Sequence, residues 1–172
     1  MTDAQIDACA VAHGDAPDQS DTRTLVVVFA NPVAQFLLHF GHDIGYRTIL
    51  VEPDAERRAG VADANADEVR ADLTGSADAD VVVADHHRAE LGEVLRDALA
   101  VPSRWVGVIG SPRHPAPHIP ALRDLGVADD EIARVHRPIG LNIGSRTPGE
   151  IAISTLAGLI ADRNGRPGGF AF

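Results

Sequence analysis

The feature that most constrains the fold is a run of β-branched and apolar residues, TLVVVF, from Thr24 to Phe29. A strand with one face in water alternates apolar and polar side chains, and this run shows no such alternation. It therefore predicts a strand that is covered on both faces, as in a parallel sheet between two layers of helices.

The next residues predict a helix and a second strand. Apolar residues recur at the spacing of one helix face, at Val33, Phe36, Leu37, Phe40 and Ile44. Gly45 follows, where a glycine commonly ends a helix. The segment YRTILV, Tyr46–Val51, predicts a strand and completes a βαβ unit of about 30 residues.

Strand-like and helix-like segments keep alternating along the rest of the chain. Buried strands are predicted at Val81–Ala84 and Trp105–Ile109, and helices at Leu91–Leu99, Ile119–Leu125 and Ala128–Ile132. Residues 56–79 carry no clear pattern. The alternation predicts an α/β fold, Rossmann-like and doubly wound, with a mostly parallel sheet in a single domain.

The last helix has a strong start signal. Thr147 and Glu150 have the spacing of a capping box, and Pro148 stands at the first helical position. The predicted apolar face of this helix consists of Ile153, Leu156, Ala157 and Ile160.

The length of 172 residues suits one domain. Residues 1–22 are rich in small and acidic residues and predict a flexible N-terminal segment, whereas 23–163 carry the Rossmann-like pattern. Residues 164–172 are rich in glycine and proline and predict a loose C-terminal tail.

Charge and composition narrow the function. The net charge is −10, and all 15 basic residues are arginines. An acidic chain without a basic run argues against binding to nucleic acid or an anionic membrane, and the lack of lysine excludes Schiff-base chemistry. The single cysteine, Cys9, excludes an internal disulfide. With no signal peptide or membrane span evident, we expect a cytoplasmic protein.

The turn after the first strand is where a dinucleotide-binding fold carries G-x-G-x-x-G. Here the turn reads FANPVA, Phe29 to Ala34, and none of the three glycines is present. Glu52, at the end of the second strand, stands at the position of a ribose-binding carboxylate. Without the glycine motif, Glu52 is more simply interpreted as a solvent-facing acid at a strand end.

A second polar cluster, Asp85-His86-His87, follows the third predicted strand directly. Acidic and histidine side chains at a strand's carboxyl end are metal ligands in some phosphoesterases. The alternative is that His87 opens a helix that Asp85 caps.

The second half of the chain holds the most specific segments. Gly110 and Ser111 stand where the fourth strand leaves the sheet, followed by Arg113. Further on, RPIGLNIGSRTPGEIA runs from Arg137 into the capped helix. Glycines, an arginine and the amide groups of a helix start together predict a pocket for an anion.

These segments resemble the C-terminal domain of the XdhC/CoxI family. The likeness is carried by VGVIGS (106–111), by the pattern L-x-x-L-G-V (122–127) and by HRPIGLNIGSRTPGEIAIS (136–154). The family typically has PIGLDIGARTPEEIA at the last of these. The resemblance extends over about 24–162 and is strongest over 105–161. Two family segments differ: GAGHVG is FANPVA here, and THDH is ADHH.

The resemblance implies a non-catalytic accessory protein that matures molybdenum hydroxylases of the xanthine or carbon monoxide dehydrogenase type. Such a protein would bind the molybdenum cofactor and hand it to the apoenzyme. It would act as a homodimer and with a CoxI-type domain protein as a further partner. The implied cofactor contacts, together with Glu52 from the strand-end pattern, are Gly110, Ser111, Arg113, Gly140, Asn142, Gly144, Arg146 and Thr147.

Three other functions stay open from the residues alone. The βαβ start and Glu52 suit an NAD(P)-dependent oxidoreductase, although the missing glycines argue against it. Asp85-His86-His87 suits a metal-dependent phosphoesterase. The third is a dimeric structural partner whose pocket is vestigial. We assign no catalytic residue and no metal ligand.

Overall fold

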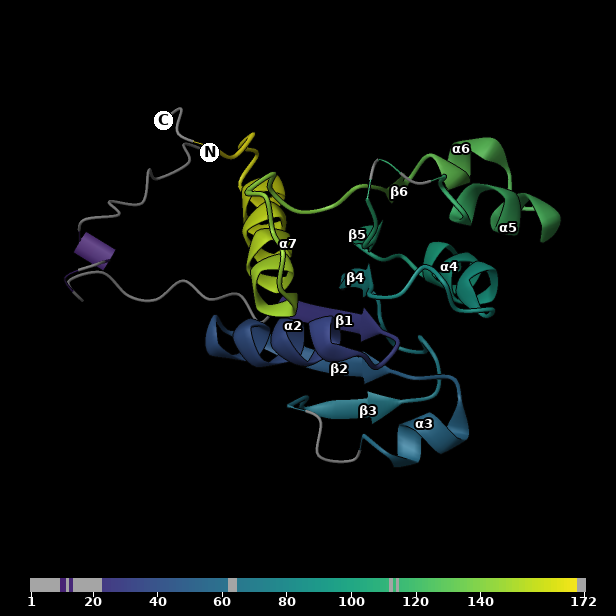
Figure 1. Cartoon of the computed structure of the whole chain (residues 1–172), viewed down its shortest axis with the longest axis horizontal. Coiled ribbons are helices and arrows are strands. Elements are labelled where there is room, and N and C mark those ends of the chain that lie inside the picture. The colour runs from purple at the N-terminus through teal and green to yellow at the C-terminus, as the bar shows by residue number, and fades with distance from the viewer. Residues whose placement is uncertain are drawn as a thin grey trace.

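A computed structural model describes residues 10–11, 13, 23–61, 65–111, 113 and 115–169 (Figure 1). Its strands are β1 (Arg23–Val28), β2 (Tyr46–Val51), β3 (Glu68–Arg70), β4 (Asp80–Val83), β5 (Trp105–Val108) and β6 (Val135–His136). Its helices are α2 (Pro32–Asp43), α3 (Ala55–Ala59), α4 (Leu91–Ala100), α5 (His118–Asp124), α6 (Asp129–Ile132) and α7 (Pro148–Arg163).

The described strands form one six-stranded sheet in the order β3-β2-β1-β4-β5-β6. Every strand pair in it is parallel. The chain winds outward from β1 in one direction and from β4 in the other, as a doubly wound Rossmann-like fold requires. The predicted fold class is confirmed, and the described sheet is parallel throughout.

Helices cover both faces of the sheet (Figure 1). Side chains alternate along β1, so that Val26 and Val28 join one core with α4, whereas Leu25 and Val27 join a second core with α2 and α7. All four residues are fully buried. The unbroken apolar run therefore marks a strand between two helical layers, as predicted.

Helix α2 presents a different face to the sheet from the predicted one. Its buried residues are Ala34, Leu37, Leu38 and Gly41, whereas Phe36 and Ile44 are exposed. A Cβ on Gly41 would lie 2.8 Å from Leu25 Cδ2 of β1. The side of α2 that packs on the sheet is therefore the side with small residues, because these let the helix axis approach the sheet closely. The large apolar residues lie on other sides of the helix. Gly45 ends the helix with a positive φ of 88°, as predicted.

Helix α7 shows the same kind of correction. The capping box of Thr147 and Glu150 is present, with Pro148 in the first turn. The predicted apolar face is rotated, since Ile153 is exposed and Ala152, Ser154, Thr155, Leu156 and Leu159 are the buried residues. Gly158 explains the rotation, because a Cβ there would lie 3.0 Å from the Cα of Gly140 in the preceding loop.

Short elements fill the region without a sequence pattern. Helix α3 and the edge strand β3 lie within or next to 56–79, and β6 forms the other edge of the sheet. The described helices include none that is long and apolar enough to cross a membrane. Most of the N-terminal segment 1–22, including Cys9, and the final residues 170–172 lie outside the described residues.

Candidate functional site

The carboxyl ends of all the described strands meet at one edge of the sheet, because the strands are parallel. The winding direction reverses between β1 and β4, and the two loops that leave these strands are joined there. Asn31 caps α2 by accepting a hydrogen bond from Ala34 N (2.8 Å), and its side-chain amide donates to the carbonyl of Ala84 (2.9 Å). Asn31 thus fixes the geometry of the crevice in which such folds bind ligands.

Glu52 lies beneath the first turn and is fully buried. Its Oε2 accepts a hydrogen bond from the backbone amide of Ala30 (3.0 Å), and its Oε1 accepts one from Asp54 N (3.2 Å). The expectation of a solvent-facing acid is therefore wrong. An apolar strand that is covered on both faces carries its terminal residue into the interior, where the carboxylate needs a partner.

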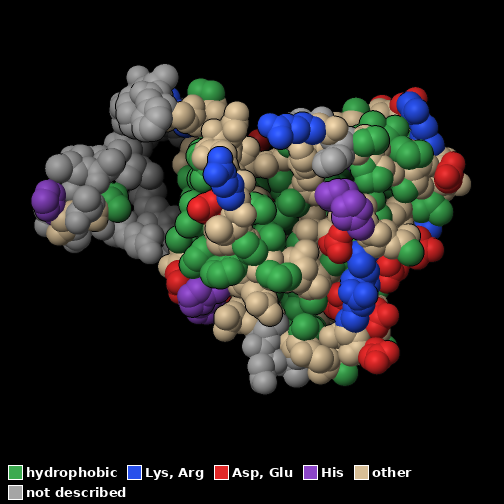
Figure 2. Space-filling view, viewed as in Figure 1, with side chains coloured by type: hydrophobic (Ala, Val, Ile, Leu, Met, Phe, Trp, Pro, Cys, Tyr) green, Lys and Arg blue, Asp and Glu red, His purple; other side chains and the backbone are tan. Residues whose placement is uncertain are grey.

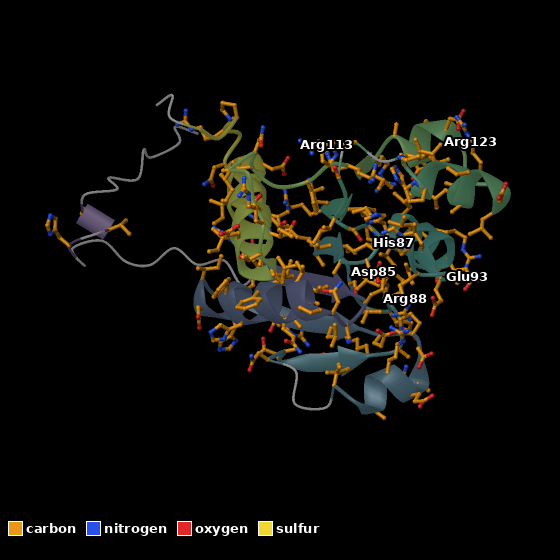
Figure 3. The ribbon with its side chains drawn as sticks, viewed as in Figure 1. Asp85, His87, Arg88, Glu93, Arg113 and Arg123 are labelled. Atoms are coloured by element: carbon orange, nitrogen blue, oxygen red, sulfur yellow. The ribbon has the colours of Figure 1, made fainter. Side chains whose placement is uncertain are left out.

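Arg88, in the loop after β4, is that partner. Its Nη1 and Nη2 lie 3.2 and 3.0 Å from the two oxygens of Glu52, and Nη2 also donates to Glu90 (2.8 Å). The guanidinium stands 4.5 Å from the ring centroid of Phe29, which is buried. Figure 3 shows Arg88 below Asp85 and His87 at this edge.

The hydrogen-bonding groups of the first turn are therefore satisfied within the protein. In a dinucleotide-binding fold the turn amides and the strand-end carboxylate face the ligand. Here the Ala30 amide and both oxygens of Glu52 are bound internally, and Phe29 holds the turn at a φ of 73°. A cavity of about 450 Å³ lies beside the turn, lined by uncharged residues including Asn31, Gln35 and Leu38. Neither feature offers a cation to a phosphate.

The Asp85-His86-His87 segment forms a turn and does not start a helix. Asp85 Oδ1 accepts from His87 N (2.8 Å), and α4 begins only at Leu91. The expected cap of a helix by Asp85 is therefore wrong. His86 Nδ1 donates to the carbonyl of Ile109 (2.8 Å). Its pKa lies below the usual histidine value, first because burial disfavours the charged ring.

A metal site at this segment has no further support. The described part of the chain contains no group of three or more His, Cys, Asp or Glu side chains that could hold a metal ion. The rings of His86 and His87 instead lie next to each other, with their centroids 4.1 Å apart.

Gly110 and Ser111 form the exit of β5, where Arg137 packs against them. A Cβ on Gly110 would lie 2.6 Å from Arg137 Nε, so a larger residue here would push the guanidinium away from this backbone. Arg137 Nη2 donates to the carbonyl of Ser111 (3.1 Å). Arg113 follows on the exposed side, and Figure 3 places it near the top of the gap between α7 and α5.

The segment from Gly140 to Thr147 lies against α7. Gly140 has a φ of 84° and approaches Ser154, whose hydroxyl donates to Leu141 O (2.7 Å). Glu150 accepts hydrogen bonds from the amides of Arg146 (2.6 Å) and Thr147 (3.2 Å). These amides are therefore bound within the chain, and what the segment exposes is the side chains of Asn142 and Arg146.

The predicted site residues thus fall into three groups. Glu52 is enclosed under the first turn, Gly110, Ser111 and Arg113 lie at the exit of β5, and 140–147 lie along α7. Sequence reasoning missed Arg88 and did not single out Arg137. The position of Glu52 at the end of a buried strand indicated that a cation must pair with its carboxylate. The sequence alone did not indicate which arginine provides this cation.

Basic and histidine side chains follow the carboxyl edge on one face of the molecule. Figure 2 shows histidine beside acidic and arginine side chains below it, and a further arginine at the top of the face. In Figure 3 the labelled residues of this region are His87, Asp85, Arg88 and Arg113. The cluster carries charges of both signs, because Arg88 is paired with Glu52 and Glu90 and Asp85 lies beside the histidines.

The chain matches known proteins over most of its length. The family model of the XdhC Rossmann domain matches residues 25–159. A solved structure described as a xanthine dehydrogenase from Bacillus halodurans superposes with a TM-score of 0.67 at 25% sequence identity, covering 86% of this chain and 44% of that one.

A shorter and closer match is to the uncharacterised protein YqeB of Escherichia coli (strain K12). It is 44% identical over 77 residues, which make up 45% of this chain and 14% of YqeB. This chain therefore spans less than half of the length of YqeB and less than half of the length of the Bacillus halodurans protein. Since the family model spans the strands and helices described above, the chain belongs to the XdhC Rossmann-domain family.

Proposed function

We propose that this chain is an accessory module for a molybdenum hydroxylase of the xanthine dehydrogenase type. In this role it binds the molybdenum cofactor at the carboxyl edge of the sheet and passes it to the apoenzyme. The observation that carries the proposal is the exit of β5, where Gly110 lets the guanidinium of Arg137 lie against the backbone. Family membership supports the choice of client, because the relative of known structure is described as a xanthine dehydrogenase.

The residues present fit an anionic cofactor at this exit better than at the first turn. The molybdenum cofactor is a pterin that carries a phosphate, so it needs a cation at one end. Arg113 and Arg137 flank the Gly110-Ser111 backbone, whereas the turn at Phe29 is closed by the Glu52–Arg88 pair. When bound, the cofactor supplies the molybdenum and its sulfur ligands to the client enzyme. The residues of this chain bind, orient and release it.

Each group of site residues has its own task in this proposal. Arg113 contributes an exposed positive charge, and Ser111 contributes a hydroxyl that accepts a hydrogen bond from Arg113 N (3.2 Å). Asn142 and Arg146 offer polar side chains from the loop before α7. Glu52 acts inside the fold and takes no part in binding. The apoenzyme, a CoxI-type domain and a second copy of this chain are the proposed partners.

The two enzymatic alternatives gain no support from the geometry. An NAD(P)-dependent oxidoreductase needs the first-turn amide and the strand-end carboxylate, which are bound to each other here. A metal-dependent phosphoesterase needs more ligands than Asp85, His86 and His87 supply in the described residues.

Equilibrium binding of the molybdenum cofactor tests the proposal. We expect wild-type protein to bind, and Arg113→Ala and Arg146→Ala each to weaken binding by roughly tenfold or more, since a charge-assisted hydrogen bond contributes about 1.5–3 kcal/mol. Arg96→Ala is the matched control, because Arg96 is an exposed arginine of α4 that pairs with Asp97 (2.8 Å).

A functional assay completes the test. Cofactor-loaded protein should restore activity to a xanthine dehydrogenase apoenzyme, and the two arginine variants should restore less. The proposal fails if the protein binds no cofactor, or if Arg96→Ala weakens binding as much as Arg113→Ala and Arg146→Ala do.

A further inference from the structure

His118, at the start of α5, is a buried polar side chain. It is only 4% exposed, and its Nδ1 has no hydrogen-bond partner among the described residues. An imidazole ring nitrogen that loses water without gaining a partner destabilises the fold. An apolar ring would fill the same space at less cost, so an unpartnered histidine here points to a partner that arrives from outside.

Arg137 connects His118 to the exit of β5. Its positive charge and the burial of the ring both lower the pKa of His118, with burial the larger cause. The same guanidinium lies against Gly110 and donates to the carbonyl of Ser111 (3.1 Å). Arg137 therefore contacts the β5 exit and acts on His118 through its charge.

His86 lies in the loop after β4, the strand that neighbours β5 on the side away from β6. Its Nδ1 donates to the carbonyl of Ile109 (2.8 Å), one residue before Gly110. Arg137 also lowers the pKa of His86, after burial and the adjacent His87, while Asp85 and the bond to Ile109 act in the opposite direction. His86 and Arg137 thus contact the backbone on the two sides of Gly110, at Ile109 and at Ser111.

We propose that Arg137, His118 and His86 form a binding site for a phosphate dianion at the exit of β5. Arg137 supplies the fixed positive charge, and the unpartnered nitrogen of His118 supplies a hydrogen bond once an acceptor oxygen arrives. His86 holds the Ile109 carbonyl away from the anion, and Gly110 leaves the backbone open beside the guanidinium.

Phosphate is the anion that this combination suits. It is compact and offers several acceptor oxygens, whereas a planar carboxylate offers two and pairs best with a single arginine. A dianion also favours the protonated form of both histidines, because an opposite charge stabilises the charged ring.

This inference deepens the proposed function, and it rests on that function only for the identity of the whole ligand. If the ligand is the molybdenum cofactor, its phosphate end occupies this site. A free phosphate ion or another phosphomonoester would use the same three residues, so the test has to separate these sources.

The test titrates isotope-labelled protein with inorganic phosphate, AMP and adenosine, and follows the imidazole nitrogens by NMR. We expect phosphate or AMP to shift the His118 signals and adenosine to leave them unchanged. Tighter binding of AMP than of phosphate identifies a phosphomonoester as the ligand, and the reverse identifies the ion. Either result supports the site.

His118→Phe is the decisive variant, and His39→Phe is its control at an exposed position of α2. We expect His118→Phe to weaken phosphate binding at least tenfold while its melting temperature stays equal to or above that of the wild type. A purely structural histidine would instead lower the melting temperature and leave binding unchanged, and that result overturns the inference.

The outcomes also separate this inference from the proposed function. Phosphate binding that needs His118, without any binding of molybdenum cofactor, keeps the site and removes the cofactor proposal. Cofactor binding that is indifferent to both phosphate and His118→Phe keeps the accessory function and removes the phosphate site. If neither phosphate nor AMP binds, the site does not exist.

Discussion

Two buried carboxylates lie at opposite ends of the parallel strands, Asp80 at the amino edge of the sheet and Glu52 at the carboxyl edge, and their charges are neutralised in different ways. Asp80 begins β4 at the amino edge, where it contacts Arg104, Arg163 (3.1 Å) and the hydroxyl of Tyr46 (3.5 Å). Glu52 follows β2 at the carboxyl edge and pairs with one arginine, Arg88. Both carboxylates are fully buried.

The difference lies in what each pair connects. Arg163 lies at the end of α7, and Arg104 also reaches Asp162 of that helix (2.8 Å), so the Asp80 cluster fastens α7 to the sheet. The Glu52–Arg88 pair joins the loops after β2 and β4 across the first turn. One edge therefore uses its charges to hold a helix, and the other uses them to close a site that related folds leave open to nucleotides.

The largest effect should come from Arg88→Met. Because Arg88 is 9% exposed and Glu52 is fully buried, the variant leaves an isolated carboxylate in the interior, which costs about 3–5 kcal/mol in the free energy of unfolding. Urea unfolding at neutral pH measures this cost. The double variant with Glu52→Gln should recover most of it, and a loss that persists in the double variant would contradict the role of charge.

A smaller effect is expected from Arg163→Met at the opposite edge. Asp80 keeps Arg104 in this variant, and Arg163 is 23% exposed, so the free energy of unfolding should fall by about 1 kcal/mol. Adding Arg104→Met removes both cations and should raise the loss toward that of Arg88→Met. An equal loss of stability in Arg163→Met and Arg88→Met would contradict the proposed difference between the amino and carboxyl edges.

The smallest expected effect is a loss of folding stability at acidic pH. Burial lowers the pKa of His86 and His118 in the folded chain, so the unfolded chain binds protons at a higher pH than the folded one. This contribution to stability is complete above the ordinary histidine pKa of about 6.5 and is lost as the pH falls below it. Unfolding curves at pH 7.5 and 5.5 should show this loss.

The variant His118→Phe should lose less stability than the wild type between these two pH values. Phosphate should offset part of the loss in the wild type, because an anion at this site favours the protonated rings. Equal losses in the wild type and in His118→Phe would show that the acid sensitivity lies elsewhere in the chain.

Much of the fold follows from local sequence patterns. The run at Thr24–Phe29, the glycine at 45 and the capping box at Thr147 each depend on neighbours within a few residues, and the structure confirms them. The faces of α2 and α7 were wrong because Gly41 and Gly158 set the closest approach, and side-chain hydrophobicity does not report how near a helix can come.

The site was harder to predict because its contacts are long-range. Arg88 is 36 residues from Glu52, and Arg137 is 26 residues from Ser111. Such pairs follow only from the strand order, which places the loops after β2, β1 and β4 side by side, and likewise the segments after β5 and β6. His118 gives no sequence signal, since its importance lies in the missing partner of a buried nitrogen.

The most direct test of where the ligand binds is an NMR titration of backbone amides with the molybdenum cofactor under anaerobic conditions. We predict that the amides of Gly110, Ser111 and Arg113 shift, and that those of Ala30 and Glu52 do not. Shifts confined to Ala30, Asn31 and Glu52 would contradict a closed first turn and would return the ligand to the position it has in dinucleotide-binding folds.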